Sequence, residues 1–176
     1  MCHIVQQFLK VFLDIVLWRR GPQDLPASRL LLALTAASYV AVSALQLGVL
    51  GEKGPAWFVF VVLDPILLTG GTYLLLKLFR HPERFLQTAT AILGTGAVLG
   101  LLLFLPLQLI LSGMGAGQDS TAAGVFALLL VVVFALVTGR ILQLATESNL
   151  FTGIAVSLTY FMLINLLLGL ANGGGG

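Results

Sequence analysis

The sequence has few of the residues that soluble proteins use for charge and for chemistry. Only 9% of its 176 residues are Asp, Glu, Lys or Arg, and it has one cysteine and two histidines. With Cys2 alone, the chain can form neither an internal disulfide nor a thiolate metal cluster. His3 and His81 belong to no group with metal-ligand spacing. The sequence therefore predicts no metal site and no cofactor.

The sequence motifs of many enzymes and of nucleic-acid-binding proteins are also missing. No GxSxG, HExxH or GxxxxGKS/T pattern occurs, so there is no nucleophile elbow, zincin helix or phosphate loop. No basic patch with interleaved aromatic residues points to a nucleic-acid partner. We therefore expect a protein that is not an enzyme and that does not bind nucleic acid.

Apolar residues make up most of the chain. Hydrophobic residues account for 59% of it, and the mean hydropathy of +1.06 is too high for a water-soluble domain. A bilayer core of about 30 Å needs roughly 20 apolar residues in a helix. Five segments are long enough: 29–50, 56–78, 85–111, 121–145 and 149–171. The sequence thus predicts an all-α membrane protein with a five-helix transmembrane domain over residues 28–172.

The positive charges predict the orientation of these spans. Eight of the nine Lys and Arg residues precede the first span, lie between the second and third, or lie near the end of the fourth. Cytoplasmic loops are enriched in Lys and Arg, so we expect a cytoplasmic N-terminus and a periplasmic C-terminus. Frequent leucine and alanine, with arginine favoured over lysine, suggests a GC-rich bacterium and hence the bacterial inner membrane.

Some of these cations are also candidate contacts for anionic lipid or for an acidic partner at the cytoplasmic face. The candidates are Arg19, Arg20, Arg80, Arg84 and Arg140. For the basic stretch 77–84 the favoured interpretation is an anchor on the cytoplasmic side. Arg140 lies roughly 15 Å from Asp64 along the membrane normal, so we expect it to reach headgroups or cap the fourth span instead of pairing with that carboxylate.

The first 27 residues predict a different kind of element. Polar residues recur at spacings of four, three and four on one helix face: His3, Gln7, Lys10 and Asp14. This pattern predicts an amphipathic helix in the membrane interface, with Trp18 at headgroup depth and a break at Gly21–Pro22. A cleaved signal peptide is less favoured, because charged residues interrupt the apolar run. The glycines at 173–176 are interpreted as a linker or tag remnant.

Asp64 is the one acidic residue well inside a predicted span, and Pro65 follows it. An acidic residue at that depth needs a partner or a water-filled cavity, or it remains protonated, and the proline removes a backbone donor. The pair could form part of a transport pathway or a hydrogen-bonded kink between helices. The kink is favoured because no second acidic residue lies at that depth. Candidate donors to Asp64 at similar depth are Tyr39, Ser43, Thr159 and Tyr160.

Small residues predict close contacts between helices. Gly96 and Gly100 form a GxxxG motif in the third span, which permits tight packing. In a bundle of this size the motif serves internal packing more often than dimerisation. Asn165, near the outer end of the fifth span, is a further candidate for a hydrogen bond between helices.

Two segments resemble bacterial Yip1-domain proteins. The segment Arg84–Thr90, followed by Gly94–Gly96, looks like the start of their third span, and Phe134–Leu144 is similar to their fourth. The resemblance implies an amphipathic helix leading into five closely spaced spans. The Asp-Leu-Tyr-Gly-Pro signature of the eukaryotic members, which engage Rab GTPases, is missing, so the resemblance implies architecture and no particular activity.

Three functions are compared. The favoured one is a non-enzymatic scaffold, assembly factor or modulator of other membrane components, which contacts the lipid bilayer and a membrane-protein partner. The second is a small homo-oligomeric transporter or channel with Asp64 in its pathway. The third, an intramembrane enzyme, needs residues that the sequence does not offer.

Overall fold

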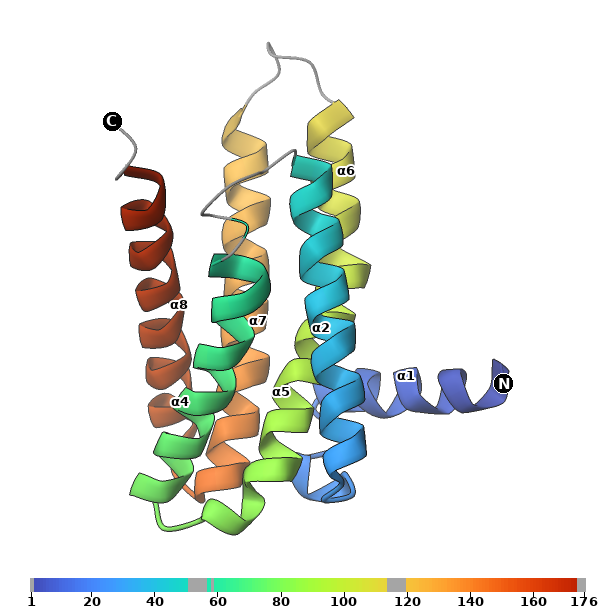
Figure 1. The fold of residues 1–176 in the computed structure, drawn as a ribbon, viewed down its shortest axis with the longest axis vertical. Helices are drawn as coiled ribbons and strands as arrows, with labels where there is room; N and C mark the ends of the chain where they lie inside the picture. Colours follow the sequence, from blue (N-terminus) through green and yellow to red (C-terminus); the bar gives the residue numbers. More distant parts are fainter. Residues whose placement is uncertain (1, 51–56, 58, 114–119, 174–176) are drawn as a thin grey trace.

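A computed structural model of the chain describes residues 2–50, 57, 59–113 and 120–173. Every regular element in these ranges is helical (Figure 1). Five of the described helices are long and apolar enough to cross a membrane: Arg29–Val49, Val61–Leu78, Pro82–Ile110, Gly124–Thr146 and Leu150–Leu167. The predicted all-helical chain with five such helices is confirmed. The predicted loop with Glu52 and Lys53, most of the loop before the fourth span, and the glycines at 174–176 lie outside the described residues.

The long helices stand side by side (Figure 1). They are α2 (Arg29–Leu50), α4 (Asp64–Leu78), α5 (Phe85–Leu99) with its continuation α6 (Leu105–Gly113), α7 (Ser120–Thr146) and α8 (Leu150–Gly173). Local capping explains two of the starts. The Ser28 hydroxyl accepts a hydrogen bond from the Leu31 N–H at 3.3 Å before α2, and the Asn149 side-chain oxygen accepts one from the Thr152 N–H at 2.7 Å before α8.

Helix α5 forms the centre of the bundle and contacts α1, α2, α4 and α7. All its residues from Thr88 to Leu99 are buried, and many are Ala, Gly or Thr, which lets neighbouring helices come close. Its buried threonine hydroxyls donate to backbone carbonyls one turn earlier; these residues are Thr88, Thr90 and Thr95. Their polar groups are therefore satisfied within the helix.

Helix α1 (Cys2–Val16) lies across the lower part of the bundle and projects to one side (Figure 1). Phe12 and Ile15 are only 1% and 2% exposed and belong to the main core. Phe12 packs on α5 at Gly94, where an added Cβ would lie 2.2 Å from the phenyl ring. The apolar side of this helix therefore packs partly on protein, whereas the sequence suggested lipid alone. Leu9 and Leu13 of this helix remain exposed, as does Leu17 directly after it.

The end of α1 also differs from the prediction. The helix ends at Val16 and not at Gly21–Pro22, because the chain turns through Trp18, whose φ is 62°. The backbone N–H of Arg19 then donates to the Asp14 carbonyl at 2.8 Å, which closes the last turn. A short 3-10 turn over Pro22–Asp24 follows and leads to α2.

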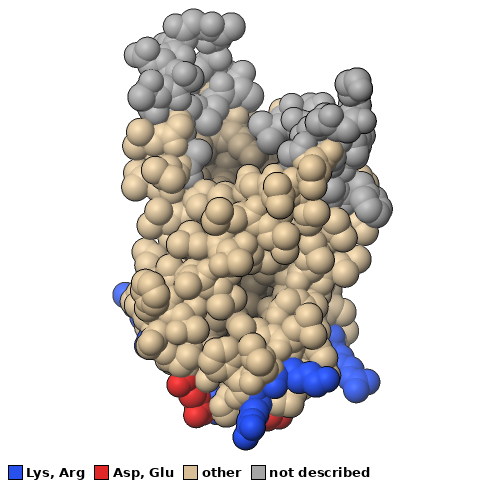
Figure 2. All heavy atoms as spheres, turned by 90° about the vertical axis from the view of Figure 1, so that its left-hand side faces the viewer, with Lys and Arg blue, Asp and Glu red and all other residues tan. Residues whose placement is uncertain are grey.

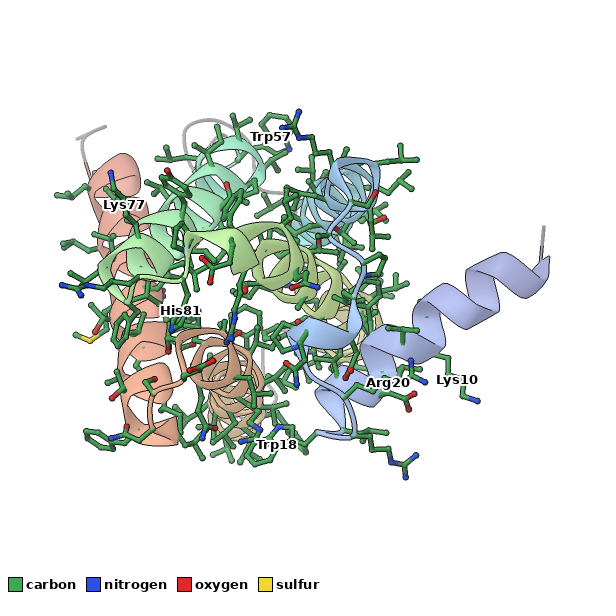
Figure 3. All side chains as sticks on the ribbon, turned by 90° about the horizontal axis from the view of Figure 1, so that it is seen from below. Lys10, Trp18, Arg20, Trp57, Lys77 and His81 are labelled. Atoms are coloured by element: carbon green, nitrogen blue, oxygen red, sulfur yellow. The ribbon has the colours of Figure 1, made fainter. Side chains whose placement is uncertain are left out.

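Charged residues gather at one end of the molecule. On the face drawn in Figure 2, the visible Lys, Arg, Asp and Glu atoms lie in its lower half. Figure 3 views this end from below, with Lys77 and His81 on the side of α4 and α8, and Lys10 and Arg20 on the side of α1. The upper part of the described surface shows no Lys, Arg, Asp or Glu in this view.

Candidate functional site

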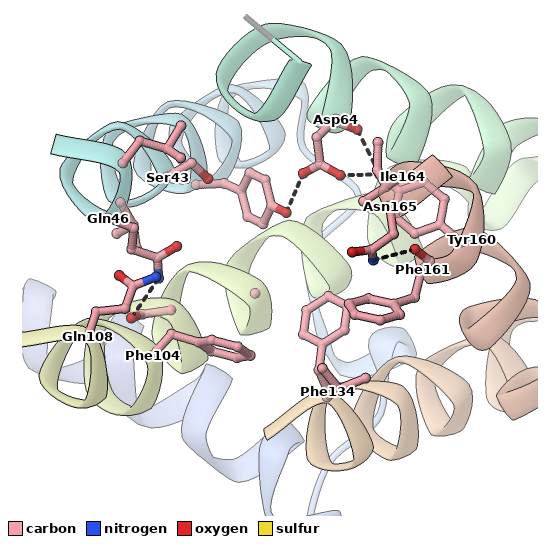
Figure 4. Close-up of a pocket in the computed structure, with 16 residues that line it drawn as sticks. Ser43, Gln46, Asp64, Phe104, Gln108, Phe134, Tyr160, Phe161, Ile164 and Asn165 are labelled. Atoms are coloured by element: carbon pink, nitrogen blue, oxygen red, sulfur yellow. Dashed lines mark hydrogen bonds between the residues drawn. The ribbon is translucent and has the colours of Figure 1, made fainter. Parts of the chain in front are cut away.

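The carboxylate of Asp64 lies inside the bundle and joins three helices. Asp64 is the first residue of α4 and is only 5% exposed. The Tyr39 hydroxyl on α2 donates a hydrogen bond to Oδ2 at 2.6 Å, and the Tyr160 hydroxyl on α8 donates to Oδ1 (Figure 4). Tyr160 also donates to the Asp64 carbonyl at 3.0 Å. Both tyrosines lie about 15 Å from the first residue of their helix, so the carboxylate is near mid-depth of the bundle.

The structure therefore brings two of the four predicted donors to Asp64. The hydroxyl of Thr159 donates instead to the Ala155 carbonyl in its own helix, at 2.8 Å. Ser43 lies on the wall of a cavity beside the carboxylate. The Asn165 amide donates to the Phe161 carbonyl at 2.8 Å, so this bond also lies within α8.

Pro65 is buried next to Asp64 and follows a π-helical turn, η2 (Val59–Leu63). A π turn shifts backbone hydrogen bonds from i→i−4 to i→i−5, and it accommodates a proline that has no N–H to offer. A second π turn, η4 (Gly100–Phe104), lies between α5 and α6 and comes shortly before Pro106. The sequence predicted a kink at Pro65 but gave no sign of the two π turns. Such turns are frequent at functional sites.

A cavity of about 340 Å³ adjoins Asp64. Its walls come from α2, α4, α5 with its continuation α6, α7 and α8, so all five long helices contribute to it. Apart from Asp64 and the two tyrosines, its polar lining residues are Ser43, Gln46, Gln108 and Asn165. Its phenylalanines are Phe104, Phe134 and Phe161. No Lys or Arg is among the described residues that line it. The volume is in the range of small-molecule sites.

Two glutamines lie on the cavity wall beside the second π turn. The Gln46 side-chain amide on α2 donates to the Gly100 carbonyl at 2.9 Å. The side-chain oxygen of Gln108, on α6, is buried and has no hydrogen-bond partner within the described part of the chain. Sequence reasoning missed both residues, although an amide side chain in an apolar span is itself a signal of a contact between helices.

The predicted GxxxG motif forms part of the same site. An added Cβ at Gly96 would lie 2.8 Å from the Tyr39 ring, and one at Gly100 would lie 2.8 Å from Val42 Cγ1. Both glycines are buried in the contact between α5 and α2. This placement agrees with the internal-packing interpretation. The small residues leave room for Tyr39, whose hydroxyl donates to Asp64.

A second glycine contact joins α7 and α8. An added Cβ at Gly153 would lie 2.1 Å from the Gly139 carbonyl oxygen, which is closer than any side-chain atom could be placed. The two glycines lie on separate predicted spans and form no GxxxG motif, so the sequence offers no local pattern for this contact. The contact sets the position of α8, and thereby of Tyr160.

The predicted cytoplasmic contact residue Arg84 is engaged within the chain. Its guanidinium donates to the carbonyls of Leu144 and Ala145, at 3.2 and 3.4 Å, and it pairs with Glu147. These carbonyls belong to the last turn of α7, whose partial negative charge a guanidinium stabilises. Nε2 of His81 lies 4.0 Å from the same glutamate. Arg84 therefore caps α7, a role that the sequence did not predict for it.

Arg140 contacts the end of the N-terminal region. Its guanidinium lies 5.7 Å from the centroid of the Trp18 ring and donates to the Gln143 side chain at 2.7 Å. This cation–π contact ties the segment after α1 to α7. Nε of Arg20 lies 3.4 Å from the Asp14 carboxylate. The other predicted contact residues of this end are exposed: Arg19 and Arg80.

No family model, curated protein or solved structure matches the chain. Function must therefore be argued from the site itself. Within the described residues, no group of three or more His, Cys, Asp or Glu side chains could hold a metal ion.

Proposed function

We propose that the chain is a five-span protein of the bacterial inner membrane, with its N-terminus in the cytoplasm and its C-terminus in the periplasm. The one-sided distribution of Lys and Arg supports this orientation. We place α1 in the cytoplasmic interface, because its exposed Leu9 and Leu13 suit the acyl boundary and Trp18, just after it, suits headgroup depth. The resemblance to bacterial Yip1-domain proteins favours the same architecture.

Within this architecture, we propose that the protein is a small transporter whose solute pathway passes through the cavity around Asp64. The observation that carries the proposal is a buried carboxylate on the wall of a cavity of about 340 Å³ inside the bundle. Ionisable residues at such depth are costly and commonly mark solute or ion pathways. A kink held only by hydrogen bonds needs no adjoining cavity. The cavity therefore favours a transport pathway at Asp64, whereas the sequence alone favoured a structural kink.

A pathway also needs segments that can move, and the two π turns are the candidates. Turn η2 lies directly before Asp64, and Gly100 and Phe104 of turn η4 line the opposite side of the cavity. A π turn has weaker and less regular backbone bonding than an α-helix, so the chain can rearrange there with little loss. We assign the hinges of the proposed transporter to these turns.

A second candidate function is a scaffold, assembly factor or modulator of other membrane components. The exposed leucines of α1, which projects beyond the bundle, favour it because they offer an apolar surface to a membrane-protein partner or a second copy. On this hypothesis Asp64 serves only to join three helices. Asp64→Asn would then leave function intact, and the purified protein would bring a stoichiometric partner.

Cysteine accessibility tests the transporter proposal directly. The background is Cys2→Ser, and Ser43→Cys places a thiol on the cavity wall at almost no change in size. The matched control is Ser38→Cys, the same substitution on the exposed side of the same helix. A membrane-impermeant methanethiosulfonate is added to right-side-out and to inverted membrane vesicles. We expect the cavity thiol to react from both sides and the control thiol, facing lipid, to react from neither.

The outcome separates the two candidate functions. Reaction of Ser43→Cys from both sides supports alternating access to one cavity. Reaction from one side only describes a dead-end pocket and contradicts a transport pathway. No reaction from either side describes a closed core, and the scaffold role then stands in its place.

A further inference from the structure

The charge of the cavity restricts what it can bind. Among the described residues that line the cavity, Asp64 is the only ionisable acid or base besides the two tyrosines that donate to it. The interior of a helical bundle screens charge poorly, so a single carboxylate repels anions and attracts cations strongly there. An anionic solute is therefore excluded, and a solute with one positive charge is favoured.

The hydrogen-bonding groups of the cavity lead to the same ligand class. Each Asp64 oxygen accepts one tyrosine hydrogen bond and keeps a second lone pair. The Gln108 side-chain oxygen is a buried acceptor without a partner. Buried acceptors are normally satisfied, so a ligand that brings N–H or O–H donors to both suits this cavity. An ammonium group supplies up to three such donors.

The apolar walls add a third property. Figure 4 shows the rings of Phe104 and Phe134 across the cavity from Asp64, and Phe161 lies near Phe134. Aromatic faces stabilise cations, and they do so best where water is excluded. A bare metal ion would use none of these walls, and a divalent ion would need several oxygen ligands that one carboxylate cannot provide.

We propose that the cavity binds a small organic monocation, an amine that carries an apolar or aromatic group. The ammonium lies at Asp64, a further donor reaches Gln108, and the phenylalanine rings enclose the apolar part. A volume of about 340 Å³ limits the ligand to a molecule of modest size. This inference rests on the proposed function and names the solute class of the same site.

The test uses three probes of one shape that differ in charge: benzylammonium, benzyl alcohol and benzoate. Each is added during methanethiosulfonate labelling of Ser43→Cys in the Cys2→Ser background. We expect saturating benzylammonium to slow labelling by about tenfold, and the neutral and anionic probes to have little effect. In Asp64→Asn the protection should disappear, because the carboxylate that selects for positive charge is gone.

A second variant keeps the test decisive where Asp64→Asn does not fold. Phe134→Leu preserves most of the wall volume and removes one aromatic face. It should raise the benzylammonium concentration needed for half protection by about fivefold. Thr95→Val is the control, since Thr95 is buried on α5, is not among the cavity-lining residues, and bonds within its own helix.

The possible failures can be told apart. Equal protection by all three probes describes a merely apolar site and overturns the cation inference. Labelling that none of the probes slows also overturns it, while access to the cavity, and with it the transporter proposal, survives. A thiol that reacts from neither side contradicts the transporter proposal itself.

Discussion

The contact between α7 and α8 allows a sharp prediction of stability. In Gly153→Ala the new methyl would lie 2.1 Å from the Gly139 carbonyl oxygen and 3.2 Å from the Gln143 backbone nitrogen. Both are backbone atoms, so no side chain can turn away to make room. Ordinary contact begins at 3.4 Å, and the two helices must therefore separate by about 1.3 Å or more locally. We expect this overpacking to cost about 1–3 kcal/mol.

A matched glycine isolates this steric cost from helix propensity. Gly70→Ala makes the same change within α4, where an added Cβ has no neighbour within 4 Å. Alanine is better than glycine inside a helix by about 1 kcal/mol, so this variant should be as stable as the parent or slightly more stable. In Gly153→Ala the same gain offsets part of the cost, which leaves a net loss of up to about 2 kcal/mol and makes this variant about 1–3 kcal/mol less stable than Gly70→Ala.

The free energy of unfolding can be measured by titrating the protein in mixed micelles with sodium dodecyl sulfate and following helix content by circular dichroism. The prediction concerns the difference between the two variants, since the unfolded state in detergent is common to both. Equal unfolding curves for Gly153→Ala and Gly70→Ala would refute the close approach of the two backbones, and with it the placement of α8 at the cavity.

Three further predictions concern other contacts. In Gly94→Ala the new methyl would lie 2.2 Å from the Phe12 ring, so α1 should leave α5, proteolysis between α1 and α2 should quicken, and adding Phe12→Leu should restore protection. Arg84→Gln removes the cap of α7, which should lower Tm in detergent by roughly 2–4 °C for a loss of about 1 kcal/mol, whereas an unchanged Tm would show that the cap adds no stability. Tyr160→Phe removes one donor to Asp64 and should cost about 1 kcal/mol in the same unfolding titration, more than Tyr73→Phe, whose ring only packs on Phe85.

The fold was largely predictable because hydropathy and charge are read along the chain. The predicted spans agree with the helices to within a few residues, since length and apolar content decide them. The approximate depth of a residue follows from its position in a span, and depth placed Tyr39 and Tyr160 among the four candidate donors to Asp64. The interfacial position of α1 and the membrane orientation stay predictions.

The rest of the site depends on which way each helix faces, and the sequence carries little information on that. Helices that are apolar all round have no polar face to indicate their partners, so the approach of Gly153 to Gly139 left no local pattern. The π turns depend on how the helices that contain them bend around their neighbours. The sequence predicted a surface contact for Arg84, because the partners that it binds belong to another helix, 60 residues further along the chain.

The sideways position of α1 gives the molecule unequal widths at different depths. The bundle alone is of similar breadth from end to end, whereas α1 extends beyond it near the charged end only (Figure 1). Because Phe12 fastens this helix to α5, the extra breadth moves with the bundle as one body. With α1 in the cytoplasmic interface, as proposed above, such a shape would take up more area in the cytoplasmic leaflet than in the other. On that placement, we expect the protein to favour membrane regions that are convex on the cytoplasmic side.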